Sequence, residues 1–188
     1  MREFCRQFRG VVALDEAYVN FSRSDGMELA LKLDNVLVMR TLSKAYSLAG
    51  LRVGYVVGAE PLIGALFKLK DSYNLDMISQ ALALAALSDI PHMRRNVEKI
   101  KATRARLAAA LTAAGHLVYP SESNFLWVRP NGIGARAMFE ALKKQRTLVR
   151  HFRGRRTGEF VRITVGTDAE VDKLMEAARR VSKKGSVA

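Results

Sequence analysis

Two short stretches of this chain gather side chains that can do chemistry. Residues 14–18 read LDEAY, and residues 41–55 read TLSKAYSLAGLRVGY. Each stretch follows an apolar run, residues 11–14 and 36–39, that is typical of a buried strand. In open α/β sheets, ligands bind beyond the carboxyl ends of the strands. That crevice would receive a carboxylate, a phenol, a hydroxyl, a lysine amine and a guanidinium. This set suits a ligand with an aldehyde, a cationic ring nitrogen, a phenolic oxygen and a phosphate.

Pyridoxal phosphate has all four of these features, and each side chain matches one of them. Lys44 can form a Schiff base with the aldehyde. Asp15 can keep the ring nitrogen protonated, so that the ring accepts electrons. Tyr18 can hydrogen-bond the phenolic oxygen, while Ser43 and Arg52 can hold the phosphate. Arg52 stands in an apolar run, where a buried arginine needs an anion, and the phosphate would supply it. The structural alternatives are a surface lysine, an aspartate that caps a helix or binds a metal, a packing tyrosine, a turn serine and a surface arginine.

Further motifs occur in a fixed order along the chain. Residues 73–80 read YNLDMISQ, residues 120–125 read PSESNF and residues 162–167 read RITVGT. With the two stretches above, they make the chain resemble the C-terminal half of fold-type I pyridoxal-phosphate aminotransferases, and most of all the histidinol-phosphate aminotransferase group. The resemblance runs from about Val11 to about Glu176. The pair Ser-Lys alone would carry no information, whereas the ordered set is specific for the fold and the cofactor.

This resemblance implies roles for two arginines and a reaction. Arg162 lies in an apolar strand, residues 160–165, where a charge is costly unless it is paired. The matching arginine of the family binds the anionic end of the substrate, and we expect Arg150 to share that work. The implied reaction is transamination between an amino donor, histidinol phosphate, and 2-oxoglutarate, which yields glutamate. The resemblance also implies a homodimer with shared active sites.

The composition is that of a globular protein. The 188 residues are 49% hydrophobic and 26% charged, with 4 prolines. No stretch approaches the about 20 apolar residues of a membrane helix, and residues 1–10 lack the apolar segment of a secretory signal. Cys5 is the only cysteine, which excludes an internal disulfide and a cysteine-based metal site. We therefore expect a cytoplasmic protein without a metal or a membrane anchor.

The formal net charge of +13 is the one compositional oddity. A basic surface can bind nucleic acid. The basic residues, however, are spread over long helices, and the one dense patch is RHFRGRR at residues 150–156. No zinc-finger, RNP or helix-turn-helix pattern accompanies it. Nucleic-acid binding therefore stays an alternative, and a solvated basic surface is the simpler interpretation.

The order of strands and helices predicts two domains. Residues 1–90 alternate strand and helix, which indicates part of a cofactor-binding α/β domain with a mostly parallel sheet. Within it, Pro61 opens a helix, and the apolar residues 78–87 form a buried one. Residues 91–188 are expected to hold a long basic linking helix, from Pro91 to the C-cap Gly115, and then a smaller α+β domain. The boundary is placed near Pro91.

The smaller domain is predicted from shorter elements. Its helices are expected at residues 135–144 and 169–181, and Thr167 with Glu170 forms a capping box for the second. Its histidine His116, like His92, is expected at a helix end, in contact with carbonyls. Its strands are expected at residues 124–128, 147–150 and 160–165.

The resemblance also implies that about half of an aminotransferase would precede Val11. That half would carry the phosphate-binding loop, the aromatic side chain that stacks on the ring, and an asparagine near the phenolic oxygen. We therefore expect the isolated chain to be incomplete as an enzyme. The alternatives are a threonine-phosphate decarboxylase or an aromatic aminotransferase with the same motifs, a nucleic-acid-binding module, and an inert fragment.

Overall fold

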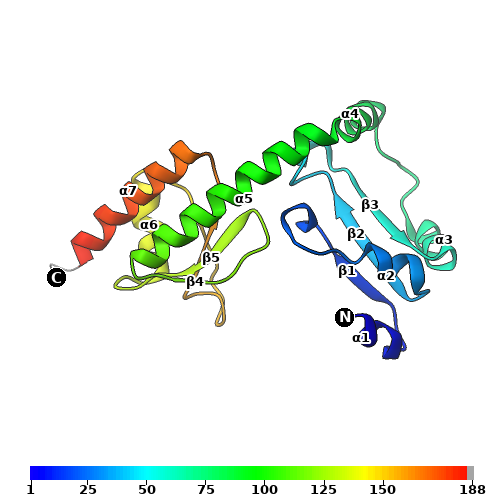
Figure 1. Cartoon of the computed structure of the whole chain (residues 1–188), viewed down its shortest axis with the longest axis horizontal. Helices are drawn as coiled ribbons and strands as arrows, with labels where there is room; N and C mark the ends of the chain where they lie inside the picture. The colour runs from blue at the N-terminus through cyan, green and yellow to red at the C-terminus, as the bar shows by residue number, and fades with distance from the viewer. Residues whose placement is uncertain (186–188) are drawn as a thin grey trace. The chain divides into compact units, whose positions relative to one another are not determined.

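The chain forms two compact units, Met1–Val97 and Glu98–Ala188. The computed structural model describes the backbone of residues 1–185 and the side chains of residues 1–181. The units divide inside one long helix, α5 (Ile90–Ala113), a few residues beyond Pro91, where the sequence places the boundary. Figure 1 labels the helices and strands of both units.

The N-terminal unit is built on a three-stranded sheet with the order β1-β2-β3. The sequence predicts a mostly parallel sheet, but only β1 and β2 run parallel, whereas β2 and β3 are antiparallel. A parallel connection needs a crossover, usually a helix, and residues 42–53 between β2 and β3 contain only a short 3-10 turn. The elements of this unit are α1 (Arg2–Gln7), β1 (Val12–Asp15), η1 (Val19–Phe21), α2 (Met27–Lys32), β2 (Val36–Thr41), η2 (Ala49–Leu51), β3 (Gly54–Gly58), α3 (Glu60–Leu69) and α4 (Met77–Ser88).

Two small apolar clusters hold the N-terminal unit together. Val36 and Val38 of β2 are fully buried and pack with Cys5 of α1 and with α2. The second cluster lies under residues 42–53, where Leu42 and Val53 pack with α4. Both ends of the segment that carries the lysine are thus anchored by buried side chains, which limits how far that segment can move.

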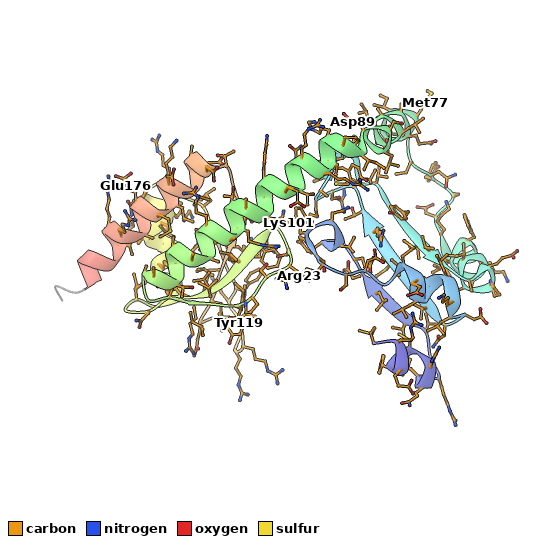
Figure 2. All side chains as sticks on the ribbon, viewed as in Figure 1. Arg23, Met77, Asp89, Lys101, Tyr119 and Glu176 are labelled. Atoms are coloured by element: carbon orange, nitrogen blue, oxygen red, sulfur yellow. The ribbon has the colours of Figure 1, made fainter. Side chains whose placement is uncertain are left out.

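Helices α3 and α4 form where the sequence predicts helices, but α4 is not buried. Pro61 stands in the first turn of α3, as predicted. Ser79 and Ala83 are the buried residues of α4, while Met77, labelled in Figure 2, is 82% exposed and Leu84 is 68% exposed. A helix that is apolar all round needs cover on every side, and the described residues cover one side only. The prediction of a buried helix over residues 78–87 is therefore wrong for this chain.

The C-terminal unit is a four-stranded sheet backed by helices. The strand order is β4-β5-β7-β6, and every pair is antiparallel. The predicted helix at residues 135–144 is confirmed, and the one predicted at residues 169–181 forms as part of a longer helix, residues 168–185. The strands at residues 124–128 and 160–165 are confirmed within a residue or so, whereas the strand predicted at residues 147–150 is wrong, because only residues 150 and 151 form a strand there. Beyond α5 its elements are β4 (Leu117–Val118), β5 (Phe125–Arg129), α6 (Ala135–Lys144), β6 (Arg150–His151), β7 (Val161–Thr164) and α7 (Asp168–Gly185).

One face of this sheet forms the core of the C-terminal unit. Side chains alternate between the two faces of a strand, and Leu126 and Val128 of β5 alternate with less buried neighbours. Val161 and Ile163 do the same on β7. These four side chains pack against α5, α6 and α7, which lie together beside the sheet in Figure 1. The helices leave the other face of the sheet without helical cover in this unit.

The ends of two helices follow the sequence signals. Gly115 has a φ of +86° at the end of α5, a left-handed conformation that favours glycine. At the start of α7, the Glu170 N–H donates to Thr167 Oγ1 over 3.3 Å, and the Thr167 N–H donates to Glu170 Oε2 over 2.7 Å. The predicted C-cap and capping box are both confirmed. Among residues 1–185, no helix has the length and apolar character to span a membrane.

Candidate functional site

Asp15 and Tyr18 lie at the carboxyl end of β1. Asp15 is the last residue of the strand and is exposed, and its Oδ1 accepts a hydrogen bond of 3.0 Å from the Ala17 N–H. That bond folds the chain into a turn that ends at Tyr18, the N-cap of the short helix η1 (Val19–Phe21). Phe21, at the other end of η1, is only 1% exposed and anchors the turn. The carboxylate and the phenol are thereby held on the same end of the sheet.

Lys44 follows the neighbouring strand β2, in the segment between β2 and β3. Leu42 and Ala45, on either side of it, are buried, whereas Lys44 itself is half-buried. Its Nζ lies 5.6 Å from the centroid of the Tyr18 ring. Because β1 and β2 are parallel neighbours, with Asp15 opposite Met39, their carboxyl ends meet at one edge. The structure therefore places Lys44 beside Tyr18 and at the same edge of the sheet as Asp15.

The side chain of Thr41 connects Ser43 to the backbone of Val53, the residue after Arg52. The sequence did not suggest this role. Its Oγ1 accepts a 3.1 Å hydrogen bond from the Ser43 N–H and lies 2.9 Å from Ser43 Oγ. The same hydroxyl lies 3.1 Å from the carbonyl oxygen of Val53. One threonine side chain thus closes the base of the loop on which Ser43 and Arg52 stand. A hydroxyl at a strand end, two residues before a serine, is the signal that could have found it.

Arg52 differs from the expectation of a buried arginine in an apolar run. It is exposed, it precedes β3, and its φ of 56° places it in the left-handed region. Its Nη1 donates a 3.0 Å hydrogen bond to the carbonyl oxygen of Ala49. The remaining guanidinium N–H groups make no hydrogen bond to the described residues. The Arg52 guanidinium is therefore exposed and can bind an anion from solvent.

An ion pair between Glu16 and Arg40 joins the segment that follows β1 to strand β2. Arg40 Nε donates to Glu16 Oε2 over 2.8 Å, and the side chains of both residues are largely buried. Burial lowers the pKa of Arg40, but its interactions with Glu16 and Tyr55 together outweigh burial and raise that pKa above its usual value. Arg40 is therefore charged. The sequence alone gives no sign of a role for Glu16 or Arg40.

The C-terminal unit carries Arg162 and Arg150, the two arginines predicted to bind the substrate, on the sheet face opposite its core. Arg162 of β7 stands between Trp127 of β5 and Arg150 of β6 in the strand register, so all three share one face. Tyr119, labelled in Figure 2, lies on the side of this sheet away from α7. The Tyr119 ring contacts Phe160 at a centroid distance of 5.7 Å, and Phe160 stacks on Trp127 at 5.2 Å. This face of the sheet therefore presents aromatic rings together with the guanidinium groups of Arg162 and Arg150.

The guanidinium of Arg162 contacts aromatic rings and, among residues 1–181, no carboxylate. Its guanidinium carbon lies 5.3 Å from the Phe125 ring centroid and 5.7 Å from that of Phe152. Arg150 shares Phe152, at 5.4 Å. Among residues 1–181, Arg162 makes no ion pair, and its Nε is buried without a hydrogen-bond partner. Two adjacent guanidinium groups without a counter-ion favour an anionic ligand.

His116 also differs from the prediction. It is 5% exposed, and its Nδ1 accepts a 3.1 Å hydrogen bond from the Asn131 N–H instead of donating to a carbonyl. Burial lowers the pKa of this imidazole below 6.5, so it is neutral at pH 7. No group of three or more metal-ligating side chains occurs in the part of the chain that the structure describes.

The family is shown by a sequence comparison. The family model described as "Aminotransferase class I and II" matches residues 1–177. A histidinol-phosphate aminotransferase of Synechocystis sp. is 44% identical over 190 residues, which cover 99% of this chain and 54% of that protein. The corresponding protein of Rippkaea orientalis is 42% identical over 186 residues, covering 99% of this chain and 53% of that protein. The chain thus spans about half the length of these relatives.

Solved structures show the same fold. The histidinol-phosphate aminotransferase of Sinorhizobium meliloti, in complex with pyridoxal-5'-phosphate, superposes with a TM-score of 0.83 at 30% identity, covering 93% of this chain and 49% of that one. The L-threonine-O-3-phosphate decarboxylase of Porphyromonas gingivalis reaches a TM-score of 0.78 at 21% identity, covering 91% of this chain and 55% of that one. The α/β fold is therefore that of about half of a fold-type I aminotransferase, as predicted.

Proposed function

This chain belongs to the class I and II aminotransferase family, and from this premise we propose that it is the lysine-bearing half of a histidinol-phosphate aminotransferase that uses pyridoxal phosphate. The observation that carries the proposal is the position of Lys44, whose Nζ lies 5.6 Å from the Tyr18 ring centroid. Both residues stand where the parallel strands β1 and β2 end, beside Asp15. The 44% identity to the Synechocystis protein supports the substrate.

The side chains at this edge fit the cofactor. Arg52 is exposed and has guanidinium N–H groups open to a phosphate, and Ser43 stands on the same loop. Lys44 and Tyr18 are adjacent, as an aldehyde and a neighbouring phenolic oxygen require. When bound, pyridoxal phosphate supplies an aldehyde that condenses with amines and a ring that withdraws electrons from the substrate α-carbon.

Each of these residues has a distinct task in the proposed reaction. Lys44 Nζ takes the proton from the substrate α-carbon as general base and later returns a proton as general acid. The Asp15 carboxylate would keep the proton on the cofactor ring nitrogen, because the charged pair is more stable than the neutral one. The Tyr18 hydroxyl would donate to the cofactor's phenolic oxygen. Ser43 and Arg52 would hold the phosphate by charge-assisted hydrogen bonds.

The substrate is bound, in this proposal, by the arginines of the C-terminal unit. Arg162 binds the anionic end of the amino donor, the phosphate of histidinol phosphate, or the carboxylate of 2-oxoglutarate in the second half-reaction. Arg150 stands opposite Arg162 in the strand register and shares this role. The unpaired guanidinium of Arg162 supports the assignment. We also propose, on the family resemblance, a step in histidine biosynthesis, a cytoplasmic location and a homodimer of the whole protein.

The N-terminal unit supports the further proposal that an upstream half completes the enzyme. Strands β1 and β3 are both edge strands of the small sheet. Beside β3, a groove of about 560 Å³ is lined by apolar side chains that include Leu66, Phe67 and Leu69 of α3. Phe67 is 66% exposed and Leu69 is 84% exposed. Open edges and apolar faces of this kind bind further strands and helices.

A steady-state assay with histidinol phosphate and 2-oxoglutarate tests both parts of the proposal. The purified chain is compared with a version extended upstream by its own coding sequence. We expect glutamate formation by the extended protein and negligible turnover by the chain alone. Comparable turnover by both would show that the chain is already complete.

The same assay separates the alternatives by their products. Release of carbon dioxide without glutamate would indicate a decarboxylase, and preference for an aromatic amino acid would indicate an aromatic aminotransferase. A salt-dependent shift of labelled nucleic acid without turnover would favour a nucleic-acid-binding module. Failure of the extended protein in all of these assays would leave an inert fragment.

A further inference from the structure

The carboxylate of Glu16 holds together three segments of the N-terminal unit. Its Oε2 accepts a 2.8 Å hydrogen bond from Arg40 Nε, and Arg40 Nη2 also lies 2.8 Å from that oxygen. Its Oε1 accepts a hydrogen bond from the Gly26 N–H. The Glu16 side chain is only 11% exposed, and that of Arg40 is 20% exposed. This carboxylate is therefore a junction inside the unit and not a surface charge.

The junction closes the loop that carries Tyr18. Residues 17–25 leave the sheet after Glu16 and lead to Gly26, the N-cap of α2, and the Glu16 carboxylate at one end of this loop accepts a hydrogen bond from the Gly26 N–H at the other end. A Cβ at Gly26 would lie 2.5 Å from Leu14 Cδ1 and 3.2 Å from Glu16 Oε1, so the backbone approaches the carboxylate closely. Asp25 Oδ2 lies 3.5 Å from Arg40 Nη2 and adds a second, longer ion pair. The loop, which includes Arg23, labelled in Figure 2, is thus tied to β2.

The other end of the junction leads to the lysine. Arg40 immediately precedes Thr41, the residue whose hydroxyl holds Ser43 and the Val53 carbonyl. Lys44 follows Ser43, and its Nζ lies over the Tyr18 ring. The Glu16–Arg40 pair therefore connects the loop that carries Tyr18 with the segment that carries Lys44. These are the two side chains that meet in the site.

We infer that the Glu16–Arg40 ion pair is a positioning device that fixes Tyr18 against Lys44 and so sets the site for its cofactor. Neither residue touches the reacting groups in this account, and both act through Tyr18. The inference rests on the proposed function, because it concerns the same cofactor site. Loss of one partner leaves a largely buried charge uncompensated, and the loop then loses its fixed closure.

The closure itself can be tested without cofactor. Hydrogen exchange of the Gly26 amide is measured in this chain and in Glu16→Gln and Arg40→Lys variants. Glu28→Gln is the matched control, because Glu28 pairs with Arg2 and Lys32 at an exposed position of the same unit. We expect faster exchange of the Gly26 amide in both variants of the pair and unchanged exchange in the control. Unchanged protection in Glu16→Gln would overturn the inference.

The positioning role is tested on the upstream-extended protein loaded with pyridoxal phosphate. In the proposed site, the Tyr18 hydroxyl would donate to the bound cofactor and so would affect the pH at which the visible absorbance of the cofactor changes. We expect Glu16→Gln and Arg40→Lys to shift this titration in the same direction as Tyr18→Phe. We also expect them to raise the cofactor dissociation constant about tenfold, as the loss of one well-placed hydrogen bond does.

A double variant makes the test specific for Tyr18. If the pair acts through Tyr18, adding Glu16→Gln to Tyr18→Phe produces little further shift, so the two effects are not additive. Additive shifts, or a lower melting temperature with an unchanged titration, would show a merely structural role and overturn the inference. If the wild-type extended protein binds no cofactor at all, the proposed function itself fails, which is a distinguishable result.

Discussion

The two units of this chain differ in how completely they bury their apolar side chains. The C-terminal unit has one continuous core in which α5, α6 and α7 cover one face of a four-stranded sheet. The N-terminal unit has two small clusters instead. Of the exposed large hydrophobic side chains in the described residues, all but three lie before Glu98. The exceptions are Leu117, Tyr119 and Leu148.

We propose that this difference accompanies a division of roles between the two units. The N-terminal unit, which lacks cover, carries Lys44, Asp15 and Tyr18, the groups proposed to act on the cofactor. The C-terminal unit, which is well packed, carries Arg162 and Arg150, proposed to bind the substrate. A buried core fixes the strand register that places the two arginines side by side. The chemical groups rely on local hydrogen bonds and on an upstream half that we propose to cover the exposed apolar surface.

The largest effect is expected from Asp15 in the upstream-extended enzyme. Asp15→Asn removes the charge partner of the cofactor's ring nitrogen but keeps a side chain of similar size. We expect cofactor binding to persist and removal of the substrate α-proton to slow by about 10²-fold or more, as with other lost electrostatic partners in active sites. Single-turnover kinetics with a deuterated α-carbon measures this step. An effect on the KM alone would contradict the division of roles between the units.

A smaller effect, of a different kind, is expected from Arg162. Arg162→Ala removes up to two charge-assisted hydrogen bonds to an anion, each worth about 1.5–3 kcal/mol. We expect the KM for anionic substrates to rise by one or more orders of magnitude while cofactor affinity stays nearly unchanged. Arg180→Ala is a control, because Arg180 is an exposed arginine of α7, the helix that packs against the opposite face of the sheet in the same unit. If cofactor affinity falls and the KM does not change, Arg162 is a phosphate clamp or a fold element instead.

The smallest effect concerns the stability of the C-terminal unit. Burial lowers the folded-state pKa of His116 below 6.5, and protonation of Nδ1 would break its bond to the Asn131 N–H. Below pH 6.5 the unfolded state therefore binds more protons than the folded state. The stabilisation from the buried, neutral His116 is present above pH 6.5 and is lost as the pH falls below it. We expect a loss on the order of 1 kcal/mol by pH 5, as for one buried hydrogen bond.

Trp127, the single tryptophan, reports on this unit through its fluorescence. Urea unfolding of the whole chain followed at pH 7.5 and pH 5 therefore measures the effect. In His116→Gln the pH-dependent part should disappear. An equal pH dependence in the variant would assign the effect to other groups.

The sequence predicted local features better than those that depend on distant contacts. The lysine segment, the capping box of α7 and the C-cap at Gly115 follow from neighbouring residues. Arg52 was expected to be buried because Leu51 and Val53 flank it, but a left-handed turn places it outside β3. The exposure of α4 could not be foreseen from its composition, because it depends on what covers the helix.

The Glu16–Arg40 pair shows the same limit within the site. The two residues are 24 positions apart and meet only because β1 and β2 pair in parallel. Spacing along the chain gives no sign of that contact. The roles of Lys44 and Asp15, by contrast, were inferred from residue type and from their place after apolar runs, and they stay predictions until they are measured.

The identity of the cofactor-binding lysine tests the account most directly. The upstream-extended protein is loaded with pyridoxal phosphate, reduced with borohydride and mapped by peptide mass spectrometry. We predict a stoichiometric label on Lys44 alone, and no specific label in a Lys44→Ala variant treated in the same way. A stoichiometric label on any other lysine, or an unchanged label in the variant, would contradict the assignment of this site.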